Sequence, residues 1–471
     1  MQARQLLQRD PRSDTSRKRR TGIGAAAAVI LVAIVVGACG SSASPAPTSS
    51  PTPALSPSAS PTYTASPSPT ATPWTSALPA EIVTAMGKAG LLAPAADNGK
   101  AAARQINDFG FDLLRRLDSA GNLVASPTSI ALSLAMVTPG ARGATATEID
   151  QVLHSFGSNG QGAEIVALLK SLQSKTTATK PAIELDVSNA AFAQRGMTLE
   201  PAYLDALSST FGGGVGTLDF RTDPEGARLA INKWASDRTH GRIPAVLKQG
   251  DITDMTRIAL ANAIYLKAGW TYPFDPDVTK PLPFTNAAGQ TVSVPTMAIS
   301  KPFKYGTGTG YRAIELPCGK DKTLSMMIIV PSDMSSFVEG LDASKLDAIV
   351  GGEETPMVVL NLPKFSAETR VDLAQTLSAM GMPTVFDKYT ADLSGITQDE
   401  RLYVSHVIHQ ANIDVDESGV TAAAVTVTTG EATMGPEPPI EFKVNRPFLY
   451  LIRDTTSGAV LFMGRIDDPS K

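Results

Sequence analysis

The 471-residue chain has few of the residues on which disulfide frameworks and most catalytic sites depend. It contains two cysteines, Cys39 and Cys318, and four histidines. Two cysteines allow at most one disulfide, so a chain of this length must be stabilised mainly by its hydrophobic core. No G-x-S-x-G nucleophile sequence precedes a histidine in a strand–turn–helix setting. The pair His406 and His409 is H-x-x-H, not the H-E-x-x-H of zinc proteases, and residues three apart on a strand face opposite sides. We therefore expect neither an enzyme nor a bound metal or other cofactor.

Sustained positive charge is also missing from most of the chain. The formal net charge is −4, and seven basic residues lie within residues 1–38, where only Asp10 and Asp14 oppose them. The rest of the chain is therefore more acidic than the net charge indicates. Nucleic acids and similar polyanions are bound by clustered lysines and arginines, so we expect no nucleic-acid partner.

The first 38 residues have the pattern of a secretory signal. Residues 17–20 read RKRR, and residues 21–38 are uncharged and largely apolar. This apolar stretch approaches the length of a membrane span, so a retained membrane helix is the alternative. Residues 36–39, VGAC, resemble a bacterial lipobox, which implies cleavage before Cys39 and lipidation of its thiol. The resemblance predicts a lipoprotein signal peptide at 1–38 and a protein on the extracellular face of the bacterial cell membrane, anchored through Cys39 or released.

A stalk is expected to follow the anchor. Residues 40–80 contain no charged residue and consist mainly of Pro, Ser, Thr and Ala. Such a segment buries too little apolar surface to order itself, and its prolines favour extended backbone. We assign residues 39–88 to the lipidated cysteine and a disordered stalk, and residues 89–471 to one folded domain.

The segment from Glu417 to Pro439 has the sequence of a strand without an evident partner. Residues 420–429 are small or β-branched, with no charge and no proline, and such residues favour extended backbone. If they are extended, the side chains that share one face are Val420, Ala422, Ala424, Thr426 and Thr428. Pro436, Pro438 and Pro439 then exclude further pairing in a central strand. The alternative is an ordinary small-residue loop or edge strand.

Several ordered motifs resemble the serpin family. They are NLVASPTSI at residues 122–130, NKWASDRTHGRI at 232–243, LANAIYLKAGW at 260–270, NRPF at 445–448 and LFMGR at 461–465. The resemblance covers the chain from about residue 90 to Pro469. The resemblance implies an α+β serpin fold, with three β-sheets, a shell of about nine helices and an exposed reactive-centre loop. In serpins a target protease cleaves this loop, which then inserts into a β-sheet.

The resemblance also assigns residues to loop insertion. The hinge, where insertion begins, comprises Glu417, Ser418, Gly419, Val420, Thr421, Ala422, Ala423, Ala424 and Val425. The shutter, below the centre of the sheet, comprises Ser126, Ser129, Asn262 and His409. The breach, at the end of the sheet where the loop enters, comprises Trp270, Lys364 and Glu417, and the last two are expected to form a salt bridge. One position departs from the family pattern, because most inhibitory serpins have Thr where this chain has Val420.

The resemblance places the cleaved bond near Met434. If Glu417 is the seventeenth residue before the bond, the bond is Thr433–Met434, but the loop is longer than is typical, and a shift of one residue gives Met434–Gly435. We favour Met434–Gly435, because Met is unbranched and can fill an apolar protease pocket. No Lys or Arg lies between Glu417 and Pro439. The expected partner is therefore a secreted elastase-, chymotrypsin- or subtilisin-like serine protease, and less often a cysteine protease.

The expected activity is inhibition by a monomer that traps the protease as a covalent acyl-enzyme. Two alternatives are a non-inhibitory serpin that acts as a binding protein, and a surface adhesin carried on the stalk.

Overall fold

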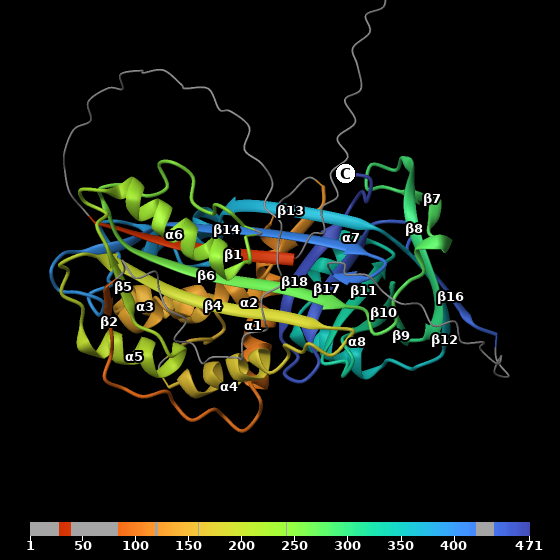
Figure 1. The fold of residues 1–471 in the computed structure, drawn as a ribbon, viewed down its shortest axis with the longest axis horizontal. Helices are drawn as coiled ribbons and strands as arrows, with labels where there is room; N and C mark the ends of the chain where they lie inside the picture. The colour runs from red at the N-terminus through yellow and green to blue at the C-terminus, as the bar shows by residue number, and fades with distance from the viewer. Residues whose placement is uncertain (1–27, 39–82, 118–120, 159, 242, 421–437) are drawn as a thin grey trace, which may run out of the picture.

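The computed structural model describes residues 28–38, 83–117, 121–158, 160–241, 243–420 and 438–471. Within these residues the chain forms three β-sheets and nine α-helices, as the family resemblance implies (Figure 1). The α-helices are α1 Lys100–Arg116, α2 Pro127–Ala135, α3 Gly143–Val152, α4 Gly162–Gln173, α5 Pro201–Phe211, α6 Pro224–Arg238, α7 Met334–Glu339, α8 Ala343–Gly351 and α9 Ala374–Met380. Short 3-10 helices lie at Thr138–Gly140, Pro276–Val278 and Thr384–Phe386.

The largest sheet, here called the main sheet, has eight strands. They are β1 Ala28–Ala38, β2 Val83–Ala85, β4 Ile183–Gln194, β5 Val215–Leu218, β6 Thr256–Gly269, β13 Phe365–Asp372, β14 Leu402–Asp416 and β15 Gly419–Val420. The strand order from one edge to the other is β13, β14, β6, β4, β5 and β2, with β1 and β15 both lying between β14 and β6. Both β1 and the two-residue β15 pair with β14 on one side and with β6 on the other.

The other two sheets come mainly from the second half of the chain. The six-stranded sheet has the order β3 Leu123–Ala125, β18 Val460–Ile466, β17 Phe448–Asp454, β11 Leu324–Pro331, β10 Tyr311–Cys318 and β9 Lys304–Gly308. The four-stranded sheet has the order β16 Ile440–Lys443, β12 Met357–Pro363, β8 Thr291–Pro302 and β7 Lys280–Thr285. Figure 1 shows α6 over one face of the main sheet and α1 and α2 behind it.

Strand β6 is buried on both faces. Ile258, Leu260 and Ile264 belong to the larger core, which also contains α1, α2 and the six-stranded sheet. Ala261 and Tyr265 alternate with them and pack in a second core with Ile231 and Trp234 of α6 and with Phe192 of β4. A strand covered on both sides needs an almost continuous apolar sequence, which explains why residues 258–266 carry no charge. The strands beside β6 are therefore also enclosed between two layers.

Most of the helices and strands follow the sequence patterns. Helix α1 buries Ile106, Phe109 and Leu113, as their spacing predicts. The spacing of Val371, Leu373, Leu377 and Met380 predicts a helix that begins at Val371, but this start is wrong, because α9 begins at Ala374. Val371 instead pairs with His409, across the ladder between β13 and β14. Here pairing along a long neighbouring strand outweighs the helical spacing of the apolar residues.

The N-terminal apolar segment forms a strand, which the sequence pattern did not indicate. Residues 28–38 read AVILVAIVVGA and form β1. This segment is rich in Val and Ile, which favour extended backbone, so the same residues suit a signal peptide or a strand. No helix in the described part of the chain is long and apolar enough to cross a membrane. Strand β2 pairs with β5 and lies within the expected stalk, so the structured chain reaches back to residue 83.

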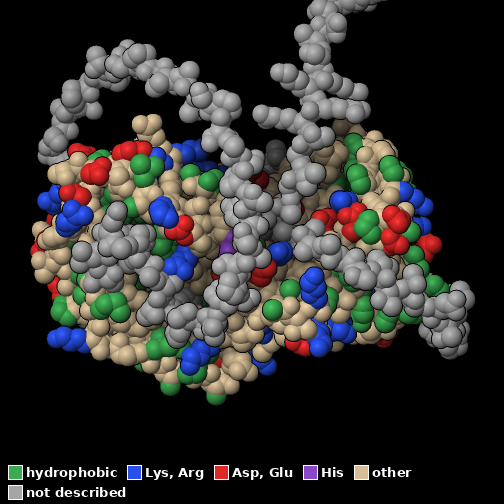
Figure 2. Space-filling view, in the orientation of Figure 1, with side chains coloured by type: hydrophobic (Ala, Val, Ile, Leu, Met, Phe, Trp, Pro, Cys, Tyr) green, Lys and Arg blue, Asp and Glu red, His purple; other side chains and the backbone are tan. Residues whose placement is uncertain are grey.

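Charged side chains of both signs are interspersed over the face shown in Figure 2. No single-sign patch dominates that face.

Candidate functional site

The first turn of α2 lies beneath the centre of the main sheet. Ser126 is the residue before this helix, and its Oγ accepts a hydrogen bond from the backbone N–H of Ser129 at 3.1 Å. Pro127 begins the helix at a position where no backbone N–H donor is needed. A serine followed by proline thus fixes the start of the helix, and both serine side chains are completely buried.

This turn is hydrogen-bonded to both strands that flank β1. Ser129 Oγ donates to Oδ1 of Asn262 on β6, and the backbone N–H of Ser126 donates to Nε2 of His409 on β14 at 3.4 Å. Asn262 in turn donates through Nδ2 to Oδ1 of Asn189 on β4 at 2.5 Å. The structure therefore brings together the four residues expected at the shutter. We call these four residues and Asn189 the shutter cluster.

Burial determines the charge state of His409. The side chain is completely buried, and this burial lowers the pKa of His409 to about 3. The imidazole is therefore neutral near pH 7, and because Nε2 accepts a hydrogen bond, Nδ1 carries the proton. No described group accepts a hydrogen bond from Nδ1. The His409 ring is thus held by one hydrogen bond, from the first turn of α2 to Nε2.

A second group of residues lies at the end of the main sheet where β14 turns into β15. Lys364 Nζ lies 2.8 Å from Oε2 of Glu417, as expected for the breach, and Thr279 Oγ1 donates to Oε1 of Glu417 at 2.8 Å. The backbone N–H of Phe274 donates to the Glu417 carbonyl at 2.9 Å. Partial burial is the largest single influence and opposes ionisation of Glu417, but the hydrogen bonds from Lys364, Thr279 and the backbone, with the charge of Lys364, together outweigh it and hold the pKa of Glu417 below its usual value.

Trp270 joins the same region to the chain that leads into the loop. Its indole Nε1 donates to the Asp416 carbonyl at 2.9 Å, and its backbone N–H donates to the Ser418 carbonyl at 3.0 Å. The ring is buried and meets Phe274 edge to face, with centroids 6.2 Å apart. We call Trp270, Thr279, Lys364 and Glu417 the breach cluster. The hydrogen bonds of this cluster hold the segment immediately before Gly419.

Gly419 is required by its backbone conformation and by its surroundings. Its φ is +149°, and a Cβ at this position would lie 2.2 Å from the Ala268 carbonyl oxygen. The next residue, Val420, is completely buried and pairs with Val415 of β14 and Ala268 of β6. The departure from Thr at this position thus places an apolar side chain in the core.

The remainder of the expected hinge, Thr421, Ala422, Ala423, Ala424 and Val425, lies outside the described residues. So do Thr433, Met434 and Gly435 around the expected cleaved bond, and Cys39 at the expected lipidation site. The described part of the hinge, from Glu417 to Val420, is bonded to the breach cluster and to both flanking strands.

Asn189 and Thr279 were not identified from the sequence. Asn189 opens the segment NAAFAQ at residues 189–194, which resembles a serpin segment but carried no assigned role, and Thr279 lies in no motif. Only the three-dimensional structure places them against Asn262 and Glu417. The alternating pattern of residues 183–187 predicted the strand that carries Asn189, but no signal in the sequence indicated which of its polar residues is hydrogen-bonded inside the molecule.

The histidines do not form a catalytic or metal-binding group in the described residues. His406 is partly exposed and lies 2.6 Å from Asp372, whereas His409 is buried beside Ser126, so the two do not share a site. His154 and His240 lie at the surface, 2.7 Å from Asp112 and 2.8 Å from Asp186. No group of three or more His, Cys, Asp or Glu residues that could hold a metal occurs in the part of the chain that the structure describes.

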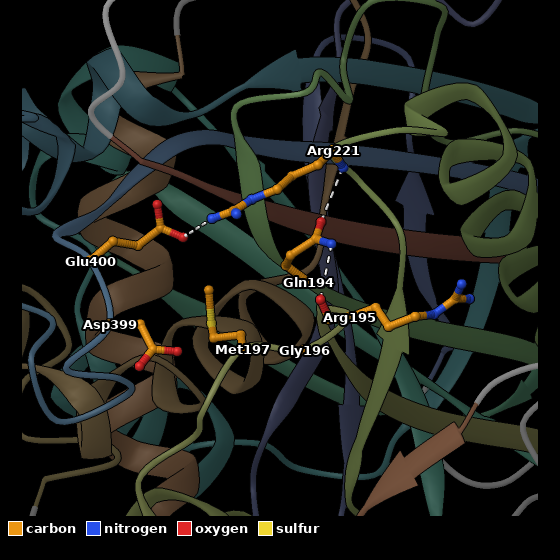
Figure 3. Close-up of a pocket in the computed structure, with 7 residues that line it drawn as sticks. All are labelled: Gln194, Arg195, Gly196, Met197, Arg221, Asp399 and Glu400. Carbon is orange, nitrogen blue, oxygen red and sulfur yellow. Dashed lines mark hydrogen bonds and ion pairs between the residues drawn. The ribbon is translucent and has the colours of Figure 1, made fainter.

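A polar pocket of about 240 Å³ lies at the end of β4, and its lining residues are labelled in Figure 3. Its polar groups are largely bonded to the protein itself. Arg221 lies 2.8 Å from Glu400, and Gln194 accepts from the backbone N–H of Arg221 and donates to the Arg195 carbonyl. Asp399 accepts from the backbone N–H of Thr198. The pocket shares no residue with the shutter or breach clusters.

Comparison with known proteins identifies relatives over most of the chain. The serpin (serine protease inhibitor) family profile matches residues 104–469. Leukocyte elastase inhibitor of Xenopus tropicalis is 34% identical over 373 residues, covering 77% of this chain and 97% of that protein. Iripin-8 of Ixodes ricinus is 34% identical over 380 residues, covering 78% of this chain and 93% of that protein. The crystal structure of the thermophilic serpin tengpin in the native state has the same fold, with a TM-score of 0.72, 22% identity, and coverage of 82% of this chain and 99% of that one.

We expect Ser129→Ala to destabilise the folded protein by about 1–3 kcal/mol, because it leaves Asn262 Oδ1 buried without its donor. Ser133→Ala is a matched control on the same helix, since Ser133 is equally buried and its Oγ has no partner among the described residues. Urea unfolding of the two variants measures the difference. Equal stability of the two variants would contradict the assigned role of the Ser129–Asn262 bond.

Proposed function

Because this chain belongs to the serpin family, we propose that it inhibits serine proteases by covalent trapping and loop insertion. The observation that carries the proposal is the position of β15. Gly419 and Val420, the first residues beyond the breach cluster, already pair with both β14 and β6. The chain entering the loop therefore starts as a strand of the main sheet, and continued pairing in the same direction is insertion. Serpins are protease inhibitors and not catalysts.

The reaction begins as ordinary proteolysis. The serine hydroxyl of the protease attacks the carbonyl carbon of the cleaved bond, and its oxygen forms an ester with the acyl part of the loop. The peptide C–N bond breaks, and the amine takes a proton and becomes the new N-terminus of the downstream fragment. The loop is then free at its downstream end but still attached at Gly419, so it can extend β15 and carry the esterified protease with it.

The energy for this movement comes from backbone pairing. About a dozen newly paired residues give on the order of ten net hydrogen bonds, each contributing roughly 0.5–1.5 kcal/mol. That sum is comparable with the entire stability of a typical domain, roughly 5–15 kcal/mol. The intact protein can therefore be held in its uncleaved form by a kinetic barrier, which cleavage removes.

The two clusters suit this movement in different ways. The breach cluster holds the segment that must stay fixed while the loop swings, through the bonds from Trp270, Thr279 and Lys364. The shutter cluster ties β6 and β14 separately to the first turn of α2, through Asn262 and His409. Because none of these bonds joins β6 directly to β14, a strand can lie between them without breaking the cluster.

We also propose that the protein reaches the extracellular face of the membrane through a lipid on Cys39, as the lipobox resemblance indicates. Expression of the full gene with Cys39→Ala, followed by detergent partitioning, tests this proposal. The wild-type protein should enter the detergent phase and the variant should not, since the thiol is the only proposed anchor. Equal partitioning would show that the apolar segment itself is retained as the anchor.

We expect an SDS-stable complex with an elastase-, chymotrypsin- or subtilisin-like protease, with the released C-terminal fragment beginning at Gly435. Trypsin should be inhibited weakly or not at all, because its specificity pocket requires Lys or Arg. Gel electrophoresis detects the complex, and mass spectrometry of the fragment identifies the bond. A fragment that begins at Met434 moves the bond to Thr433–Met434.

Ala424→Arg is the matched control, because the loop remains cleavable but its insertion would bury a charge. This variant should be cut without retaining the protease. Complete cleavage of the unmodified protein with full recovery of protease activity would contradict inhibition.

A further inference from the structure

Strand β1 occupies the central position of the main sheet. Along β6 it pairs from Ala28 opposite Leu266 to Gly37 opposite Thr256, and along β14 from Val29 opposite Asn412 to Ala38 opposite Leu402. It is antiparallel to both neighbours. Figure 1 shows it between β14 and β6, under α6. A segment from the start of the chain thus completes a sheet whose other strands begin at residue 83 or later.

The register of β15 along β6 shows which other segment of the chain could take the position of β1. Val420 of β15 pairs with Ala268, and Ala28 of β1 pairs with Leu266. Both segments run antiparallel to β6, so β1 continues in the direction that β15 begins. If β15 were extended in its own register, Ala422 would lie opposite Leu266, and residues 422–432 would need the pairing positions that β1 holds.

The two segments have a similar composition. Residues 28–38 read AVILVAIVVGA and residues 422–432 read AAAVTVTTGEA. Both lack proline and carry at most one acidic residue. Both consist mainly of Ala, which is small, and of the β-branched residues Val, Ile and Thr, which favour extended backbone. Both therefore fit a strand position that is enclosed between two layers.

We propose that residues 28–38 are an internal competitor of the reactive-centre loop, which holds the insertion position until it is displaced or removed. This proposal rests on the proposed function. While β1 is paired with β6 and β14, insertion of the loop must break one set of backbone hydrogen bonds for each set it forms, so cleavage alone releases little energy. Inhibition then requires the segment to leave the sheet.

The end of β1 indicates how removal could occur. Ala38 is its last residue, and the expected lipoprotein cleavage lies between Ala38 and Cys39. Such cleavage would separate the entire strand from the domain. The pairing is also irregular at this end, with register shifts between Val35 and Val36 along β14 and between Val36 and Gly37 along β6. The chain that retains residues 28–38 should therefore trap less protease than the processed chain, because trapping must wait until β1 leaves the sheet.

A disulfide across the β1–β6 ladder tests the placement. Ala33 lies opposite Ala261, so Ala33→Cys with Ala261→Cys should oxidise to a disulfide in the unprocessed full chain carrying Cys39→Ser. Ala33→Cys with Ala263→Cys is the control, because Ala263 lies opposite Leu31 and the diagonal separation, roughly 7–8 Å between Cα atoms, exceeds the range that a disulfide spans. Cys318 should not interfere, since it is buried and its pKa is raised to about 12.

Protease trapping by the oxidised and reduced forms then tests the competition. The oxidised protein should be cut without forming an SDS-stable complex, and reduction should increase complex formation. Absence of the 33–261 disulfide, or equal oxidation of the control pair, would overturn the placement of β1. Equal trapping by the oxidised and reduced forms would overturn the competition. If the chain lacking residues 1–38 also traps no protease, the proposed function fails, whereas a 33–261 disulfide would still support β1 as the occupant of the sheet.

Discussion

The pairing of backbone groups between β6 and β14 is the constraint on which the rest of this structure depends. Both strands lie between the two cores, so an unpaired N–H or C=O along their facing edges would be removed from water without a partner. A strand must therefore fill the space, or β6 and β14 must close on each other. In the structure the space is filled by β15 at one end and β1 along the rest. A protein built in this way can exchange one occupant for another.

The breach and shutter clusters hold the neighbouring segments in place during such an exchange. The Lys364–Glu417 pair and the Trp270 bonds hold the chain just before Gly419, whose conformation and close contact with Ala268 exclude any side chain. The shutter cluster uses neutral groups, all buried except Asn189, so its hydrogen bonds are not weakened by charge changes near pH 7. The occupant of the central position is thus free to differ while its neighbours remain anchored.

Much of this arrangement could be predicted from the sequence, and the exceptions have physical causes. The spacing of Ile106, Phe109 and Leu113 predicted α1. The family resemblance assigned Ser129 and Asn262 to one site, and in the structure they are hydrogen-bonded to each other. Residues 28–38 were not predicted as a strand, because a Val- and Ile-rich run satisfies a signal peptide and a buried strand equally well. Only the pairing partners distinguish the two, and these are more than 200 residues away in the sequence.

Hydrogen–deuterium exchange of the full chain, before and after a target protease cleaves the loop, tests the central claim most directly. The account predicts that backbone amides of residues 28–38 are protected before cleavage and that those of 422–432 exchange rapidly. After cleavage and displacement of β1, protection should pass to residues 422–432 and be lost from residues 28–38. Rapid exchange of residues 28–38 before cleavage, or protection of both segments at once, would contradict a single strand position that the two segments share.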